Sequence, residues 1–126
     1  MKMNYIFIFL GVLFGFFLAG CYKDVIQPGS DPDGPPQSVS FKQDLSPLFK
    51  AKCGLTGCHV PGSHKPNMDV EANTYINIVS GGYVNTLIPK ESIIYKQINS
   101  SMLEYIPAQS DRQKVFDWIR NGAPNN

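Results

Sequence analysis

Two cysteines and a histidine lie close together near the middle of the chain, in the segment CGLTGCH. Two thiols followed directly by a histidine can attach a haem covalently, because the thiols add across the vinyl groups of the porphyrin and the imidazole reaches the iron. The usual spacing between the cysteines is two residues, whereas Cys53 and Cys58 are separated by four. Gly54 and Gly57 allow the longer loop to bulge. The segment therefore predicts one covalent haem c bound through Cys53 and Cys58, with His59 as the proximal iron ligand.

Two other interpretations of the same residues remain open. Cys53 and Cys58 could form a structural disulfide, although closing so short a loop would stabilise the protein little. Together with His59 and His64 they could instead bind zinc, although the side chains of neighbouring residues such as Cys58 and His59 rarely point at one ion. We favour haem, because a histidine directly follows the second cysteine.

Helices are expected on both sides of this motif. Before it, four apolar residues have the spacing of one helical face: Phe41, Leu45, Leu48 and Phe49. This element runs straight into Cys53. Pro47 argues against a single unbroken helix, so we expect Ser46 to be the N-cap of a restarted helix with Pro47 as its first residue.

After the motif, two short helices are indicated. The first contains three apolar residues and ends at a glycine pair: Tyr75, Ile76, Val79, Gly81 and Gly82. The second covers residues 90–98, with Ile94 and Ile98 facing inward.

The last helix has the clearest signals. The sequence SDRQ at residues 110–113 fits a capping box, and Gly122 with Pro124 stops the helix. Its apolar stripe consists of Val115, Trp118 and Ile119. No segment shows a convincing alternation of apolar and polar residues, so the sequence predicts an all-α domain of helices and loops.

The N-terminus has the features of an export signal. Lys2 is followed by an uncharged apolar run over residues 5–18, which is too short to span a bilayer comfortably and is typical of the apolar region of a signal peptide. The tetrapeptide LAGC that follows resembles the lipobox of bacterial lipoproteins, in which the cysteine is acylated and becomes the new N-terminus. On that resemblance Cys21 is the lipidation site. An ordinary signal peptide or a transmembrane anchor is the alternative, and each of these places the domain outside the cytoplasm.

Three segments are therefore expected. Residues 1–20 form the lipoprotein signal peptide, residues 21–39 a lipidated flexible tether rich in Pro, Gly and Asp, and residues 40–126 the folded domain. The expected location is extracytoplasmic, anchored by lipid to a bacterial membrane, with the outer membrane favoured and the domain on its periplasmic or surface side.

Composition excludes several classes of function. Eleven basic and ten acidic residues give a net charge of +1, which falls to near zero when Lys2 is removed with the signal peptide. This balance gives no basic surface for nucleic acid. The sequence also lacks a recognisable catalytic serine, a pair of catalytic carboxylates and a phosphate-binding glycine loop, so we do not expect an enzyme.

Beyond the motif, several phrases resemble one family in order and spacing. They are SFKQDLSPLFKAKC before the four-residue spacer and CH after it, then NMDV, IPKESIIYKQI and VFDWIRNGAPNN. Together, over residues 40–126, they resemble the small monohaem cytochrome c domains of lipoproteins from Bacteroidetes and Planctomycetes. The resemblance implies the class I cytochrome c fold, an all-α domain wrapped around one covalently bound haem whose iron has a histidine and a methionine ligand.

The same resemblance suggests the distal iron ligand. In that family a Met-Pro-Pro phrase precedes the tryptophan of the last helix by about seventeen residues. Here Met102 lies sixteen residues before Trp118 and is followed by Leu103, while Ile106-Pro107 offers the proline without the methionine. Met102 is therefore the candidate distal ligand, although this departure from the family pattern leaves its ligation open.

The function expected from these features is that of an electron carrier, which exchanges electrons with redox partner proteins and contacts the membrane through its lipid anchor. Two alternatives stay open. If Met102 does not ligate, an open sixth position could bind peroxide or a diatomic gas, as in a haem peroxidase or gas sensor. If no haem is attached, the chain could be a surface lipoprotein stapled by a disulfide.

Overall fold

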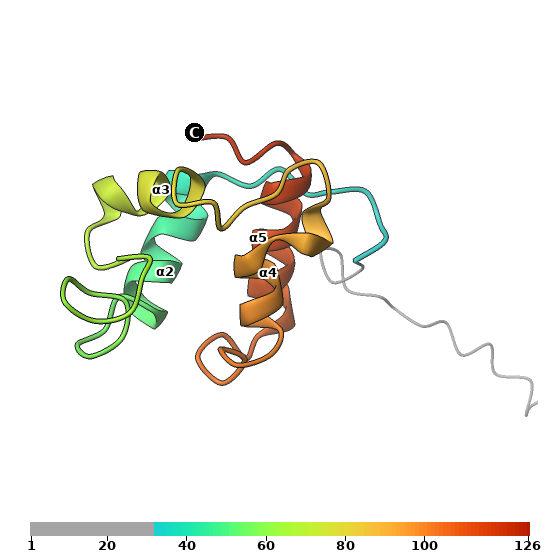
Figure 1. The fold of residues 1–126 in the computed structure, drawn as a ribbon. Helices are drawn as coiled ribbons and strands as arrows, with labels where there is room; N and C mark the ends of the chain where they lie inside the picture. The colour runs from blue at the N-terminus through green and yellow to red at the C-terminus, as the bar shows by residue number, and fades with distance from the viewer. Residues whose placement is uncertain (1–31) are drawn as a thin grey trace, which may run out of the picture.

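The computed structural model describes residues 32–126, and this part of the chain is helical and contains no strand (Figure 1). In chain order its elements are η1 (Phe41–Leu45), α2 (Ser46–Lys52), α3 (Glu71–Val79), η2 (Pro89–Glu91), α4 (Ile93–Ile98) and α5 (Gln109–Arg120). The expectation of an all-α domain is therefore confirmed for these residues. The expected signal peptide, Cys21 and the first part of the expected tether lie outside the described residues.

A π-helical turn, η1, leads without a break into α2, and Pro47 explains why this turn is wide. Proline has no N–H to donate, and its ring crowds the carbonyl group four residues earlier. The N–H of Ser46 donates instead to the carbonyl of Phe41, five residues back. The wider turn lets the chain pass the proline and enter α2, whose C-terminal end leads into Cys53.

Ser40 is the N-cap of the helical segment that begins at Phe41. The hydroxyl of Ser40 accepts a hydrogen bond from the N–H of Gln43 (3.2 Å), and the carboxylate of Asp44 accepts one from the N–H of Ser40 (2.9 Å). The expectation that Ser46 caps a restarted helix was wrong, because Ser46 has helical backbone angles and is buried. Its hydroxyl donates to the carbonyl of Glu71 (3.3 Å) and so ties α2 to the start of α3.

Both short helices after the motif form, but α4 begins at Ile93 and not at residue 90, because Pro89–Glu91 form the separate 3₁₀ turn η2. α3 ends just before the glycine pair, where Gly82 has a positive φ of 78°. Ile76 of α3 is 58 % exposed, so including it in the apolar pattern was wrong, and Ile78 is the buried isoleucine of this helix. Ile94 and Ile98 of α4 are buried, which confirms their inward orientation.

α5 contributes much of the core. Val115, Trp118 and Ile119 are fully buried, as expected, and the chain leaves the helix at Gly122, which has a φ of 89°. The expected capping box was wrong. The N-cap residue is Ala108, and no side chain caps the first turn of the helix.

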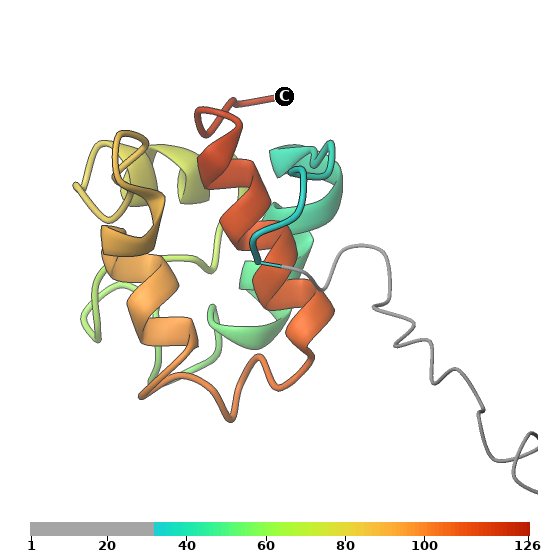
Figure 2. The same ribbon diagram turned by 90° about the vertical axis from the view of Figure 1, so that its right-hand side faces the viewer.

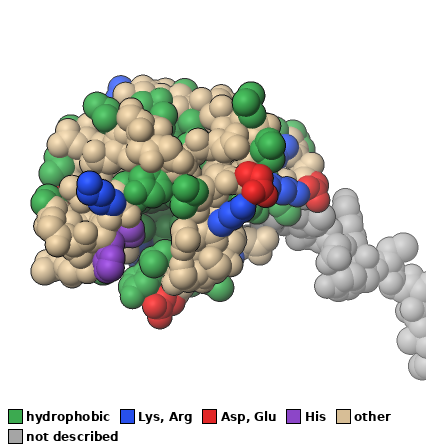
Figure 3. Space-filling view, in the orientation of Figure 1, with side chains coloured by type: hydrophobic (Ala, Val, Ile, Leu, Met, Phe, Trp, Pro, Cys, Tyr) green, Lys and Arg blue, Asp and Glu red, His purple; other side chains and the backbone are tan. Residues whose placement is uncertain are grey.

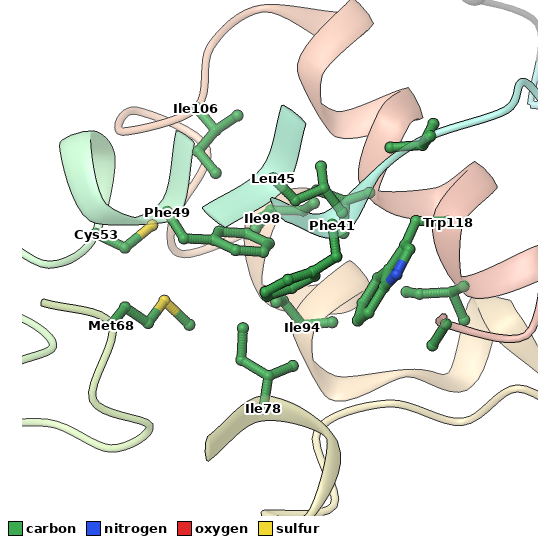
Figure 4. Close-up of a cluster of buried hydrophobic side chains, with 14 residues drawn as sticks. Phe41, Leu45, Phe49, Cys53, Met68, Ile78, Ile94, Ile98, Ile106 and Trp118 are labelled. Carbon is green, nitrogen blue, oxygen red and sulfur yellow. The ribbon is translucent and has the colours of Figure 1, made fainter. Parts of the chain in front are cut away.

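The apolar core runs between aromatic rings at one end and two sulfur-containing side chains at the other (Figure 4). The ring of Phe41 lies 5.2 Å from that of Trp118 and 5.1 Å from that of Tyr75, measured between centroids. At the opposite end, Cys53 and Met68 are buried near the end of α2. Because large aromatic rings dominate the energy of a core, this packing holds η1 against α3 and α5, and η1 leads through α2 to the start of the cysteine motif.

The buried carboxylate of Asp117 holds the start of the described chain against α5 (Figure 2). Asp117 is 1 % exposed, and its Oδ2 accepts hydrogen bonds from the main-chain N–H and the side-chain amide of Gln37 (3.2 and 2.9 Å). Its Oδ1 accepts from Gln113 (2.9 Å) and Arg120 (3.3 Å). These donors compensate the cost of burying the charge. The last residues of the expected tether are thus packed on the domain, and Val39 is buried.

We expect Asp117→Asn to lower the free energy of unfolding by about 1.5–3 kcal/mol. The substitution removes the charge that strengthens these buried hydrogen bonds. It also places an amide N–H group, which donates, where the surrounding groups donate as well. Chemical denaturation of the purified protein measures this loss. Asp111→Asn is the control on the same helix, where a partly exposed carboxylate lies 3.8 Å from Lys114 and should contribute less than about 1 kcal/mol. Equal losses in the two variants would contradict a special role for Asp117.

Candidate functional site

A cavity of about 460 Å³ opens on the surface between the loop that follows α2 and the helix α4. Figure 3 shows a hollow on this face with histidine side chains at its edge. Its volume falls within the range of about 300–1,000 Å³ that is typical of ligand sites. Buried apolar side chains from several elements form part of its wall: Phe49, Met68, Ile94 and Ile98. The cavity can therefore accept a ligand with large apolar faces.

The predicted haem-attachment residues lie on one wall of this cavity. Cys53, Cys58 and His59 all line it. Cys53 directly follows α2, and its N–H donates to the carbonyl of Phe49 (2.7 Å). After the spacer, the N–H of His59 donates to the carbonyl of Cys53 (3.1 Å), which closes the segment into a compact turn. The four-residue spacer thus still brings both cysteines and the histidine to the same cavity.

The two glycines of the spacer are required for different reasons. Gly57 has a φ of 81°, a backbone conformation that favours glycine. A Cβ added at Gly54 would lie only 2.6 Å from the carbonyl oxygen of Met68 and 2.8 Å from the Cα of Asp69. Since both contacts are with backbone atoms, no side-chain rotation could relieve them. Any larger residue at position 54 would push the segment around Met68 away from the motif.

Gly54→Ala is therefore expected to destabilise the protein by about 1–3 kcal/mol, the usual cost of overpacking a tight site. Chemical denaturation is again the measurement. Thr56→Ala, at an exposed position of the same spacer, is the matched control and should change stability by no more than about 0.5 kcal/mol. If alanine at position 54 is as well tolerated as alanine at position 56, the close approach does not constrain the turn.

The imidazole of His59 is oriented by a main-chain carbonyl group. Its Nδ1 lies 2.9 Å from the carbonyl oxygen of Pro66. Because a carbonyl oxygen only accepts, this contact assigns the hydrogen to Nδ1 and leaves the lone pair on Nε2. A hydrogen bond of this kind on the other ring nitrogen is the usual support for a metal-ligating histidine. The N–H of Met68 also donates to the carbonyl of His59 (2.7 Å), so the histidine is held at both its ring and its backbone.

Sequence reasoning missed Pro66. A main-chain acceptor has no side-chain signature, so no residue pattern pointed to it.

Both methionines of the described chain line the cavity. Met68 is buried, and its N–H donates to the carbonyl of His59, so it belongs to the same folded loop as the histidine. Met102 is half-buried and belongs to the loop between α4 and α5 (Figure 1). The two thioethers therefore reach the cavity from different loops.

The Cys53 thiol is not activated as a catalytic nucleophile. Burial, together with the neighbouring Cys58, raises the pKa of Cys53 to about 11. A reactive cysteine needs a lowered pKa, because the thiolate is the nucleophile. Cys53 therefore stays protonated at neutral pH and is not an activated nucleophile.

The structure forms neither alternative arrangement of the cysteines. Cys53 and Cys58 are free thiols. Within residues 32–126, no three His, Cys, Asp or Glu side chains are grouped so that they could hold a metal ion.

Comparisons of the chain with protein-family models, with curated proteins and with solved structures find no match.

In the part of the chain that the structure describes, no helix has the length and apolar character needed to cross a membrane.

Proposed function

We propose that this chain is an electron carrier with one covalently bound haem c and a fold like that of class I cytochromes c. Cys53 and Cys58 would form the two thioether bonds, His59 would be the proximal iron ligand and Met102 the distal one. The observation that carries the proposal is the presence of both cysteines and an oriented histidine on the wall of one apolar cavity.

The chemistry of the cavity fits a haem. A haem has two apolar faces and carries two carboxylates, so its site needs apolar walls with cationic groups near an opening. None of the side chains lining this cavity is acidic, and three that can be cationic line it and are exposed: Lys52, His64 and Lys65. Filling the cavity would also cover apolar side chains that are otherwise open to water.

When bound, the haem supplies an iron that gains and loses one electron. The chain's own residues then determine how that iron behaves. The Pro66 carbonyl keeps Nε2 of His59 available as a ligand. The Met102 thioether would be the second iron ligand and would raise the reduction potential relative to two histidine ligands. The apolar walls would limit the access of water to the bound haem and so tune its reduction potential.

The N-terminal features indicate where the protein acts. We propose that lipidation of Cys21 anchors the protein to the extracytoplasmic side of a bacterial membrane, and that the tether lets the domain reach redox partner proteins. A tether raises the effective concentration of the domain near such partners.

The test is to express the full-length chain in a host that matures c-type cytochromes and to record a pyridine haemochrome spectrum after denaturation. We expect haem to stay with the denatured chain and to be lost from the Cys53→Ala, Cys58→Ala variant. A colourless product with a disulfide between Cys53 and Cys58 would overturn the proposal.

A further inference from the structure

One guanidinium group joins the two ends of the loop that carries Met102. Arg112, in the first turns of α5, donates from Nη1 to the carbonyls of Ile106 (2.8 Å) and Pro107 (2.6 Å) at the end of this loop. Its Nε donates to the side-chain oxygen of Asn99 (3.1 Å) at the start of the loop. Arg112 does not line the cavity. It therefore acts on the cavity only through the loop.

Hydrogen bonds within the loop also shape its middle, since the carbonyl of Met102 accepts from the N–H groups of Tyr105 (3.2 Å) and Ile106 (3.4 Å). The N–H of Met102 donates to the carbonyl of Gln97 (2.8 Å), and the side chain of Ile106 is buried in the core. Asn99 also connects Arg112 to α4, because its side-chain amide donates to the carbonyl of Tyr95 (2.8 Å). With its start and end fixed by one side chain, the loop has fewer conformations open to it.

We infer that Arg112 is a positioning residue for the distal ligand, an inference that rests on the proposed function. Arg112 holds the Met102 sulfur in the cavity and so limits how often this sulfur leaves the iron. A thioether is uncharged and a weak electron donor. Its occupancy of a metal position therefore depends on how well the chain holds it in place. Releasing the loop lets the sulfur leave more often, and a small anion or gas can then enter.

The geometry requires arginine at this position. A guanidinium offers several donors in a fixed planar arrangement, whereas an ammonium is a single point of charge. Arg112→Lys keeps the charge but cannot contact both ends of the loop with the same geometry. Arg112→Gln removes the charge and most of the donors. The effects should therefore increase in the order wild type, Lys, Gln.

The test uses the haem-loaded full-length protein and measures the rate at which cyanide binds the ferric iron, together with the long-wavelength absorption band that a methionine sulfur gives on ferric haem. We expect cyanide binding to become at least about tenfold faster in Arg112→Gln, since charge-assisted hydrogen bonds are lost. The methionine band should weaken in parallel, the lysine variant should be intermediate, and the covalent haem content should not change.

Arg120→Gln is the matched control, because it removes the same group from the same helix at a site with no hydrogen bond to the Met102 loop. Equal cyanide rates and equal methionine bands in the two glutamine variants would overturn the inference and leave Arg112 a structural residue. If Arg112→Gln fails to fold, the cyanide rate and the methionine band of Arg112→Lys are compared with those of Arg120→Gln instead. A haem-loaded wild type without a methionine band would also overturn the inference, whereas a colourless wild type would overturn the proposed function and the inference with it.

Discussion

Met102→Leu is expected to lower the reduction potential of the haem-loaded protein by on the order of 0.1–0.3 V, a part of the range of about 0.8 V that axial ligands span. Leucine has a similar volume, so the cavity wall should stay packed while the sulfur ligand is lost. The iron would then accept carbon monoxide and cyanide, which the wild type should bind slowly. A potentiometric titration and the rate of cyanide binding measure the two effects.

Met68→Leu is the natural control, since Met68 is the other methionine on the cavity wall. Its N–H donates to the carbonyl of His59, so Met68 belongs to the loop that carries the predicted proximal ligand. We expect little change in potential and no gain in cyanide binding. A large fall in potential for Met68→Leu, with none for Met102→Leu, would make Met68 the distal ligand in place of Met102. No change in either variant would favour a site with no methionine ligand, as in the sensor or peroxidase alternative.

The buried faces of most helices could be predicted because periodicity reports burial directly. Ile94 and Ile98 of α4 lie four residues apart and are buried, and Val115 and Trp118 of α5 lie three residues apart and are buried. The starts of helices were predicted less well, because several polar residues near a boundary can each act as a cap. α5 begins at Gln109, so Ser110 is already inside the helix and cannot serve as its N-cap. Ser46 is likewise inside α2, since the π-helical turn carries the chain past Pro47.

The candidate site was predictable only in part. Local spacing placed Cys53, Cys58 and His59 together, and the structure brings all three to one cavity. The groups that orient the ligands could not be predicted. The Pro66 carbonyl belongs to the backbone, which every residue shares, and Arg112 acts on carbonyl groups that lie before it in the chain. Both depend on how the loops fold back, which no local pattern of residue types records.

Without haem, the chain is expected to be much less stable. The cavity measures about 460 Å³, and at about 24 cal/mol for each Å³ an empty cavity of that size would cost on the order of 10 kcal/mol. The whole stability of a small domain is about 5–15 kcal/mol. Water entering through the open mouth lowers the cost, yet it leaves apolar side chains such as Phe49 and Ile98 in contact with solvent. The haem is therefore expected to complete the core.

Circular dichroism melts of the full-length chain, produced with and without cytochrome c maturation, test this expectation. The haem-loaded protein should melt at least about 20 °C higher, since each kcal/mol shifts the midpoint by about 4–8 °C in a domain of this size. The Cys53→Ala, Cys58→Ala variant should melt alike from both preparations, because it cannot retain the haem. A haem-free wild type that melts cooperatively near the loaded protein would contradict the expectation. It would mean that the packing of Phe41 against Trp118 stabilises the fold alone and that the cavity is tolerated without a bound group.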